Sequence, residues 1–535
     1  MNALADTCIL SHGWRRALLV LLAGAIAGLS AAPLFILPAL FVAFPVLVWT
    51  LDGVEARPTL LRRLFGPAFR IGFFFGLGYF LVTIHWVGTA FFVDGGIMLA
   101  AMPFAVLLLA TVLALFWALG IALARLVWSA GTARLFALAA GLSLAEIARG
   151  TLFTGFPFNL LGYALTANLE MMQAASLVGV YGLTFVAILI AATPALVWPS
   201  LDRPLAARLA PLFLAIAVIA AQLAYGHVRL RDTLTEPRED IALRLVQPVV
   251  PQDLKWQAFA REEIVQRLID LTTAQTGPDD AGLADITHIV WPEMAIPFFI
   301  STEPELFARI ARMIPEDVLL LTGAPREPYT EGAAPYNSIF AINTQGEILS
   351  SYDKTHLVPI GEVIPFQEQL SAIGLGQFVP GADGWAAGAE RRLFEIPGLP
   401  GFLPLICYEA VYSGGLGDAV ADAEFILVLT NDAWFDGSFG VPQSFHHARL
   451  RAVEEGLAMV RVANSGISAL IDPLGRVKAQ LPAGLVGTLD GAPDRPIAPP
   501  PFAQWRHWPF ALMVALGALI ALAGHWRWRR HARAA

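Results

Sequence analysis

The feature that most constrains this chain is a series of apolar runs that are long enough to cross a lipid bilayer. A transmembrane helix needs about 20 mostly apolar residues. The tract over residues 17–51 is too long for one such helix and is interrupted by Gly28, Pro33 and Pro38, which predicts two short spans. The sequence therefore predicts a polytopic α-helical membrane domain of about eight spans. The six single spans are expected at about 67–91, 97–127, 133–148, 171–198, 209–226 and 508–526.

The composition supports a membrane protein and argues against other classes. Hydrophobic residues make up 56% of the chain and charged residues only 15%, which is more apolar than a typical soluble protein. The formal net charge is −8, so no basic face is available to bind nucleic-acid phosphates. The two cysteines, Cys8 and Cys407, lie too far apart in the sequence to suggest a disulfide framework.

The distribution of arginines predicts how the spans are oriented. If the N-terminus is cytoplasmic, the cytoplasmic segments hold clusters such as Arg15 and Arg16. The loops expected on the opposite side, at 92–96 and 149–170, contain a single positively charged residue, Arg149. Because positively charged loops stay on the cytoplasmic side of a membrane, we expect both termini in the cytoplasm and the segment between the last two spans outside it.

That segment has the composition of a soluble α/β domain. We therefore divide the chain into a seven-span membrane domain (1–226), an extracytoplasmic domain (227–507), and a last span with a basic tail (508–535). Alternating strands and helices with some hairpins predict mixed sheets that are covered by helices. Helices are expected at about 254–275, 304–314 and 442–463, and strands at about 241–246, 287–293, 318–322, 336–342, 348–352, 402–407, 425–430, 467–472 and 477–481.

Four residues with reactive or charged side chains follow predicted strands of this domain, namely Glu293, Lys354, Glu362 and Cys407. Side chains at the carboxyl ends of strands converge on one crevice in α/β folds. A thiolate is a good nucleophile, a carboxylate can carry the proton, and an ammonium can stabilise an oxyanion. Together these groups could catalyse acyl transfer.

Each of these residues also has a structural interpretation. A cysteine after an apolar strand is usually a small buried hydrophobic residue, and lysines and glutamates are usually surface charges. Two further pairs of residues also need an interpretation. Glu146 and Arg149 lie one helical turn apart, as a structural pair or as functional groups within the membrane. His446 and His447 have no third ligand at a fitting spacing, so no metal site is expected.

The motifs around these residues carry a resemblance to a known family. Pro292-Glu293, Asp353-Lys354-Thr-His356 and Cys407-Tyr408-Glu409 resemble, in this order, the Glu–Lys–Cys signature of the nitrilase superfamily. A fuller resemblance is to the apolipoprotein N-acyltransferases, and it extends over nearly the whole chain. The further motifs that carry it are Val246-Gln247 to Trp256, Asn431-Asp432-Ala-Trp434-Phe435, Arg461-Val-Ala-Asn464-Ser465-Gly466 and the stretch from Glu146 to Pro157.

The resemblance implies a nitrilase-like αββα sandwich and a role for each site residue. Cys407 would be the nucleophile, Glu293 the general base and Lys354 the oxyanion stabiliser. Glu362, Tyr408 and Glu409 would support them. Trp256, Trp434 and Phe435 would contact acyl chains or gate the cleft, although Trp434 and Phe435 could equally fill the core or a loop.

The resemblance also implies a reaction and a location. A phospholipid would donate an acyl chain to Cys407, and the α-amine of a diacylated lipoprotein would accept it, without metal or cofactor. The enzyme would be a monomer in a bacterial inner membrane with its catalytic domain in the periplasm. Two alternatives are a membrane-tethered amidase of nitrilase type, which uses water as acceptor, and a transporter or receptor with an external binding domain.

Overall fold

The structure is a computed structural model in which the chain forms two compact units. One unit comprises residues 1–232 with 504–535, and the other comprises residues 233–503. The residues that the structure describes are 2–55, 58–96, 98–198, 204–275, 282–328, 330, 332–359, 361–363 and 384–534.

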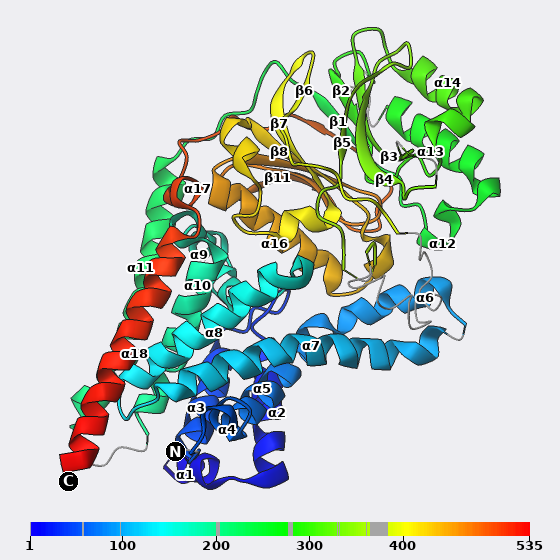
Figure 1. The fold of residues 1–535 in the computed structure, drawn as a ribbon. Coiled ribbons are helices and arrows are strands. Elements are labelled where there is room, and N and C mark those ends of the chain that lie inside the picture. Colours follow the sequence, from blue (N-terminus) through cyan, green and yellow to red (C-terminus); the bar gives the residue numbers. More distant parts are fainter. Residues whose placement is uncertain are drawn as a thin grey trace. The chain divides into compact units, whose positions relative to one another are not determined.

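The first unit is helical (Figure 1). Among the described residues, six helical stretches have the length and hydropathy to cross a membrane, and α3 is a shorter apolar helix. With α2, which has 16 residues, they account for the prediction of about eight spans. The main helices are α2 (Gly13–Gly28), α3 (Pro38–Asp52), α5 (Pro67–Ile84), α7 (Met98–Leu126), α8 (Ala133–Thr151), α10 (Ala175–Ala191), α11 (Leu205–Asp232) and α18 (Trp508–Ala534); short helices are α1 (Asn2–Leu10), α4 (Leu60–Leu64), α6 (Phe91–Asp94) and α9 (Leu169–Met172).

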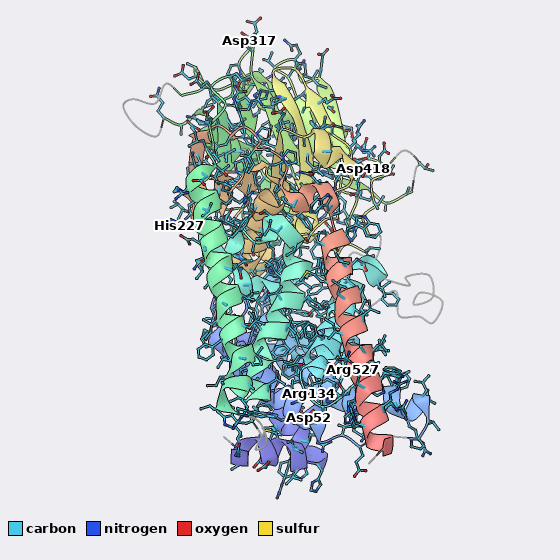
Figure 2. The ribbon with its side chains drawn as sticks, turned by 90° about the vertical axis from the view of Figure 1, so that its left-hand side faces the viewer. Asp52, Arg134, His227, Asp317, Asp418 and Arg527 are labelled. Atoms are coloured by element: carbon cyan, nitrogen blue, oxygen red, sulfur yellow. The ribbon has the colours of Figure 1, made fainter. Side chains whose placement is uncertain are left out.

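One end of this unit carries polar and basic groups. Asp52, at the end of α3, forms an ion pair with Arg134 at the start of α8, with 3.4 Å between Oδ2 and Nη2. The indole of Trp128 donates to the other oxygen of Asp52 at 2.8 Å. Arg527 of α18 lies toward the same end, whereas His227 lies near the opposite end of α11 (Figure 2).

The interior of the helical unit holds a buried ion pair between Glu146 and Arg149 of α8. Trp117 of α7 donates its indole N–H to Glu146 Oε1 at 2.8 Å. Arg149 also donates to the main-chain oxygens of Phe156 and Phe158. Because each charge has several partners, the pair holds the segment after α8 in place, which favours the structural interpretation of these two residues.

We predict that Arg149→Met destabilises the protein strongly. The substitution leaves the buried Glu146 carboxylate without its cation, a loss that typically costs about 3–5 kcal/mol. Thermal unfolding of the detergent-purified protein measures this effect. Arg231→Met is the control, since Arg231 pairs with Asp232 while its side chain is 65% exposed. Equal melting temperatures for the two variants would contradict the structural role.

The second unit contains two six-stranded sheets (Figure 1). Strands β1, β2 and β3 of the first sheet are parallel, as are β7, β8 and β9 of the second. The first sheet has the order β12 (Gly487–Gly491), β1 (Leu243–Gln247), β2 (His288–Val290), β3 (Leu319–Arg326), β4 (Tyr336–Ile342) and β5 (Ile348–Asp353). The second has the order β11 (Val477–Leu481), β10 (Ser468–Ile471), β9 (Ala458–Ala463), β8 (Phe425–Thr430), β7 (Leu399–Ile406) and β6 (Phe394–Ile396).

Apolar side chains show that the two sheets pack face to face between helices. One core joins residues of both sheets, such as Leu245 and Leu427. A second core packs the other face of the first sheet against α13 (Arg261–Thr273) and α14 (Pro304–Met313). A third packs the second sheet against α16 (Gly440–Glu455). The predicted αββα sandwich is therefore confirmed.

The prediction of one long helix over 442–463 was wrong. Helix α16 ends at Glu455, because Gly456 adopts a left-handed conformation with φ of +73°. Glycine takes this conformation without steric cost, and it commonly ends helices. The following residues form β9, which lies between β8 and β10 in the centre of the second sheet. The short strand β6 and the edge strand β12 were also not predicted.

Candidate active site

The ends of three strands bring together the residues that the sequence singled out. Glu293 follows β2, Lys354 follows β5, and Cys407 follows β7. Strand β5 runs in the same direction as β2, since β4 is antiparallel to both β3 and β5. Their carboxyl ends therefore lie along the same edge of the first sheet. Cys407 interacts electrostatically with both Glu293 and Lys354, so the three side chains form one cluster.

Lys354 lies between the two glutamates of this cluster. Its Nζ atom donates to Glu362 Oε1 at 2.8 Å and lies 3.5 Å from Glu293 Oε1. The side-chain amide of Asn337, on β4, donates to Glu293 at 2.8 Å and to Glu362 at 3.3 Å. Glu362 also accepts the main-chain N–H of Val358 at 2.8 Å. This network fixes both carboxylates against one ammonium.

The buried environment determines the protonation of these groups. Burial acts to lower the pKa of Lys354, but the carboxylates of Glu362 and Glu293 outweigh it and raise the pKa above its usual value. Burial raises the pKa of Glu293, while the nearby Lys354 ammonium opposes this shift. Lys354 is therefore a permanent cation, whereas Glu293 can take up a proton more readily than an exposed glutamate can.

Cys407 occupies a backbone elbow directly after β7. It begins the short helix η8 (Cys407–Val411) with φ of +52°, a conformation that is uncommon for residues other than glycine. Its side chain is half-buried. Burial and, to a smaller extent, Glu293 raise the pKa of the thiol to about 12, although Lys354 opposes both effects. The resting side chain is thus a thiol, and its activation requires a base.

Glu409 connects this elbow to the loop that carries Lys354. Its carboxylate is fully buried and accepts the main-chain N–H of Ile406 at 2.8 Å. It also accepts hydrogen bonds from the Tyr352 hydroxyl, from Thr355 through both N–H and hydroxyl, and from Arg391 at 2.8 Å. Burial opposes ionisation, but Arg391 and these donors outweigh it and lower the pKa of Glu409.

The remaining predicted residues differ in how far they are exposed to solvent. Tyr408 is buried and packs edge-on against Tyr412, with ring centroids 5.4 Å apart. Trp256 is 44% exposed and Trp434 is 37% exposed, so neither fills the core. Phe435 is partly buried at the end of η10 (Asp432–Phe435). The exposed indoles leave Trp256 and Trp434 available to contact a ligand.

Two polar residues of the cluster were not predicted. Asn337 lies beside Ser338 at the start of β4, before the apolar run Ile339–Ile342, and nothing in this pattern distinguishes it as a site residue. Lys255, the last residue of α12 (Gln252–Lys255), is 2% exposed and donates from Nζ to the main-chain oxygen of Glu293 at 3.1 Å. Neither contact is apparent from sequence spacing, because the partners belong to separate elements of the fold.

The two histidines of α16 lie in a buried environment. His446 and His447 are both buried, and burial lowers the pKa of His446 to about 3, so its ring is neutral. Among the residues that the structure describes, no group of three potential ligands could hold a metal ion.

The comparisons with known proteins place the catalytic unit in a defined class. The model of the carbon-nitrogen hydrolase family matches residues 243–495, which makes this unit a domain of that class. The model of the apolipoprotein N-acyltransferase N-terminal domain matches residues 23–193. A solved amidase from Nesterenkonia sp. aligns with 51% of this chain and 96% of its own, at 16% identity and a TM-score of only 0.33, which supports no further conclusion.

Full-length relatives identify the family. Apolipoprotein N-acyltransferases from Rhodopseudomonas palustris and Bradyrhizobium diazoefficiens are 40% and 42% identical to this chain. Both alignments cover 98% of this chain and 97% of the relative. The chain therefore belongs to the apolipoprotein N-acyltransferase family and is a membrane-embedded acyltransferase of the nitrilase superfamily.

We predict that Glu409→Gln lowers stability and changes its dependence on pH. The substitution removes a buried anion that Arg391 and several N–H groups need, at a cost of about 3–5 kcal/mol at neutral pH. Because folding lowers the pKa of Glu409, its stabilisation is complete above the usual glutamate pKa of about 4.3 and is lost as the pH falls below it.

Thermal unfolding between pH 7 and pH 3 measures both effects. The melting temperature of Glu409→Gln should start lower than that of the wild type and fall less on acidification. Glu424→Gln is a suitable control, since Glu424 is a surface partner of Arg238 with a side chain that is 42% exposed. Parallel curves for Glu409→Gln and the wild type would refute the assignment.

Proposed function

We propose that this enzyme transfers an acyl chain from a membrane phospholipid to the N-terminal α-amine of a diacylglyceryl-cysteine lipoprotein. The observation that carries the proposal is the clustering of Cys407, Glu293 and Lys354 in a chain that also contains membrane-spanning helices. Relatives that align over 97% of their own length are named apolipoprotein N-acyltransferase. The reaction proceeds through a covalent intermediate on Cys407.

In the first half-reaction, Glu293 removes the proton from the Cys407 thiol as the sulfur attacks the ester carbonyl carbon of the phospholipid. The carbonyl oxygen becomes negatively charged, and the Lys354 ammonium stabilises it. The carbon–oxygen bond to the glycerol then breaks, and Glu293 returns the proton to the leaving oxygen. A lysophospholipid departs and a thioester remains on Cys407.

In the second half-reaction, the α-amine of the lipoprotein attacks the thioester carbonyl. Glu293 takes a proton from the amine nitrogen, and the carbon–sulfur bond breaks as the amide forms. The proton then passes to the Cys407 sulfur, which regenerates the thiol. Glu362 and Asn337 keep Glu293 and Lys354 in position, and Tyr408 and Glu409 support the Cys407 elbow. This ping-pong sequence needs no metal or cofactor.

Both substrates are lipids, which accounts for the exposed aromatic residues near the site. Extracting an acyl chain into water is costly, at roughly 0.8 kcal/mol for each CH₂ group. We infer that Trp256, Trp434 and Phe435 contact the acyl chains or gate their entry. The exposed indoles of Trp256 and Trp434 support this role.

We infer that the enzyme lies in a bacterial inner membrane, and the arrangement of charges supports a particular orientation there. The basic C-terminal tail and the Asp52–Arg134 pair lie toward one end of the helical unit (Figure 2), and positive charge favours the cytoplasmic side. We infer a membrane domain over 1–226, a periplasmic catalytic domain over 227–507, and a final span and cytoplasmic tail over 508–535. The enzyme would act as a monomer.

We predict that the purified enzyme transfers a labelled acyl chain from phospholipid to a diacylated lipopeptide with a free α-amine. Cys407→Ser should abolish the transfer. Lys354→Met should reduce kcat by about 10²–10³-fold, as expected for the loss of an oxyanion donor. Lys478→Met is the matched control, because Lys478 has a side chain that is 44% exposed and pairs with Asp494.

Mass spectrometry of the lipopeptide distinguishes the possible outcomes. An amide-linked third acyl chain on the lipopeptide supports the proposal. Release of free fatty acid with no acylated lipopeptide would instead indicate an amidase-like hydrolase. Full activity of Cys407→Ser would overturn the assignment of the nucleophile.

A further inference from the structure

Lys255 is a second buried ammonium in the active-site cluster, and the reaction described above does not use it. Its side chain donates to the main-chain oxygen of Glu293 at 3.1 Å. It also interacts electrostatically with the Glu293 carboxylate and with Cys407. A buried lysine costs free energy unless its charge is compensated, so its presence beside these two groups requires an explanation.

The segment that carries Lys255 is held rigidly by residues at the ends of two strands. Asn431, after β8, donates to the Gln252 side chain at 2.7 Å. Asn464, after β9, donates to the main-chain oxygen of Val250 at 2.8 Å and to Asn431 at 3.0 Å. These contacts anchor the first residue of α12 and the segment before it to the ends of β8 and β9, so the fold of this unit helps to position the Lys255 ammonium.

The basic residues of the chain are distributed in an unusual way. Of the 35 lysine and arginine residues, only three are lysines, Lys255, Lys354 and Lys478. Two of these three are in the active-site cluster, and both are buried. An ammonium is a compact point charge, whereas a guanidinium needs room for its planar fork. At both buried cationic positions of the cluster, this chain therefore has the more compact cation.

Counting charges shows what Lys255 contributes. Glu293 and Glu362 both face Lys354, so these three groups carry one excess negative charge when both carboxyls are ionised. Lys255 balances it. The other carboxylate that faces Cys407, Asp432, has its own cation in Arg461, with 2.9 Å between Oδ2 and Nη2. Asp253, on the same helix as Lys255, is exposed to solvent.

We propose that Lys255 is a positioning residue that holds the turn at Glu293 and, through its positive charge, makes the Cys407 thiolate easier to form. Without Lys255, a thiolate would add to a buried cluster that already carries excess negative charge. With Lys255, the thiolate forms in a cluster that is neutral beforehand. The proposal rests on the proposed function only in taking Cys407 as the nucleophile.

The environment of Lys255 also gives the proposal a characteristic dependence on pH. Burial lowers the pKa of Lys255 to about 8, although Glu293 and Cys407 oppose this shift. The side chain is therefore charged at pH 7 and loses its charge as the pH rises through about 8. Its help to the thiolate should disappear over the same range, which a purely structural lysine would not show.

The test is the rate at which iodoacetamide alkylates Cys407 in the full-length, detergent-purified protein without lipid. Peptide mass spectrometry measures the alkylation of Cys407 separately from that of Cys8. At pH 7 the wild type should react about tenfold faster than Lys255→Met, since one pKa unit changes the thiolate fraction tenfold. By pH 9.5 this ratio should approach one. Lys255→Arg stays charged, so its advantage over Lys255→Met should persist at pH 9.5.

Other outcomes overturn the proposal. A ratio of one at every pH, or a ratio that is the same at pH 7 and pH 9.5, would assign Lys255 a structural role only. Lys478→Met is the control and should react like the wild type.

If Lys255→Met does not fold, the pH titration of ¹³C-labelled lysine, followed by NMR in the wild type, gives a second measurement. Glu293→Gln should move the titration of Lys255 to lower pH, and an unchanged titration would overturn the proposal.

These outcomes are distinct from a failure of the proposed function. Alkylation requires neither the phospholipid nor the lipoprotein, so it reports the electrostatics of the cluster alone. An enzyme that shows the expected alkylation but transfers no acyl chain would refute the proposed function and leave the role of Lys255 intact.

Discussion

The geometry of the candidate catalytic cluster depends on the hydrogen bonds that the buried carboxylate of Glu409 accepts. It binds Tyr352 on β5 and the loop after it, and it also binds the main-chain N–H of Ile406 at the end of β7. These strands belong to different sheets, whose facing sides share a core of apolar side chains. Apolar packing is not directional, so the hydrogen bonds of Glu409 set the register between Lys354 and Cys407.

Burial and neighbouring charges together determine the protonation of the groups in this cluster. The Cys407 thiol is harder to ionise, the Glu293 carboxyl takes up a proton more readily, and Lys354 stays charged because two carboxylates surround it. A neutral thiol beside a carboxylate that readily accepts its proton can be activated when an acyl donor binds. If Cys407 is the nucleophile that we propose, such a site keeps its partly exposed thiol unreactive between turnovers.

The sequence predicted the parts of this structure that depend on local pattern. Strand β8 has the predicted bounds, because an unbroken apolar run between turn residues defines it. The positions of Glu293, Lys354 and Cys407 at strand ends also followed from such runs. By contrast, the helix predicted over 442–463 runs through Gly456, and the continuous apolar stretch after this glycine belongs to a central strand. Apolar periodicity alone does not separate a buried helix from a buried strand.

Contacts between distant segments could not be predicted in this way. Nothing near Glu409 in the sequence indicates that it accepts hydrogen bonds from residues more than 50 positions earlier. Asn337 and Lys255 reach Glu293 from separate elements, and only the packing of the sheet brings them there. The resemblance to a family supplied the proposed catalytic residues, but the residues that contact them became visible only in the folded chain.

The central claim is that Cys407 carries the acyl chain as a thioester. Mass spectrometry of the purified protein after incubation with phospholipid, in the absence of an acceptor, tests it most directly. The account predicts that the peptide containing Cys407 gains the mass of an acyl chain and that hydroxylamine removes this chain. A Cys407→Ser variant should form no such thioester. Deacylation of phospholipid without any adduct on Cys407 would contradict it.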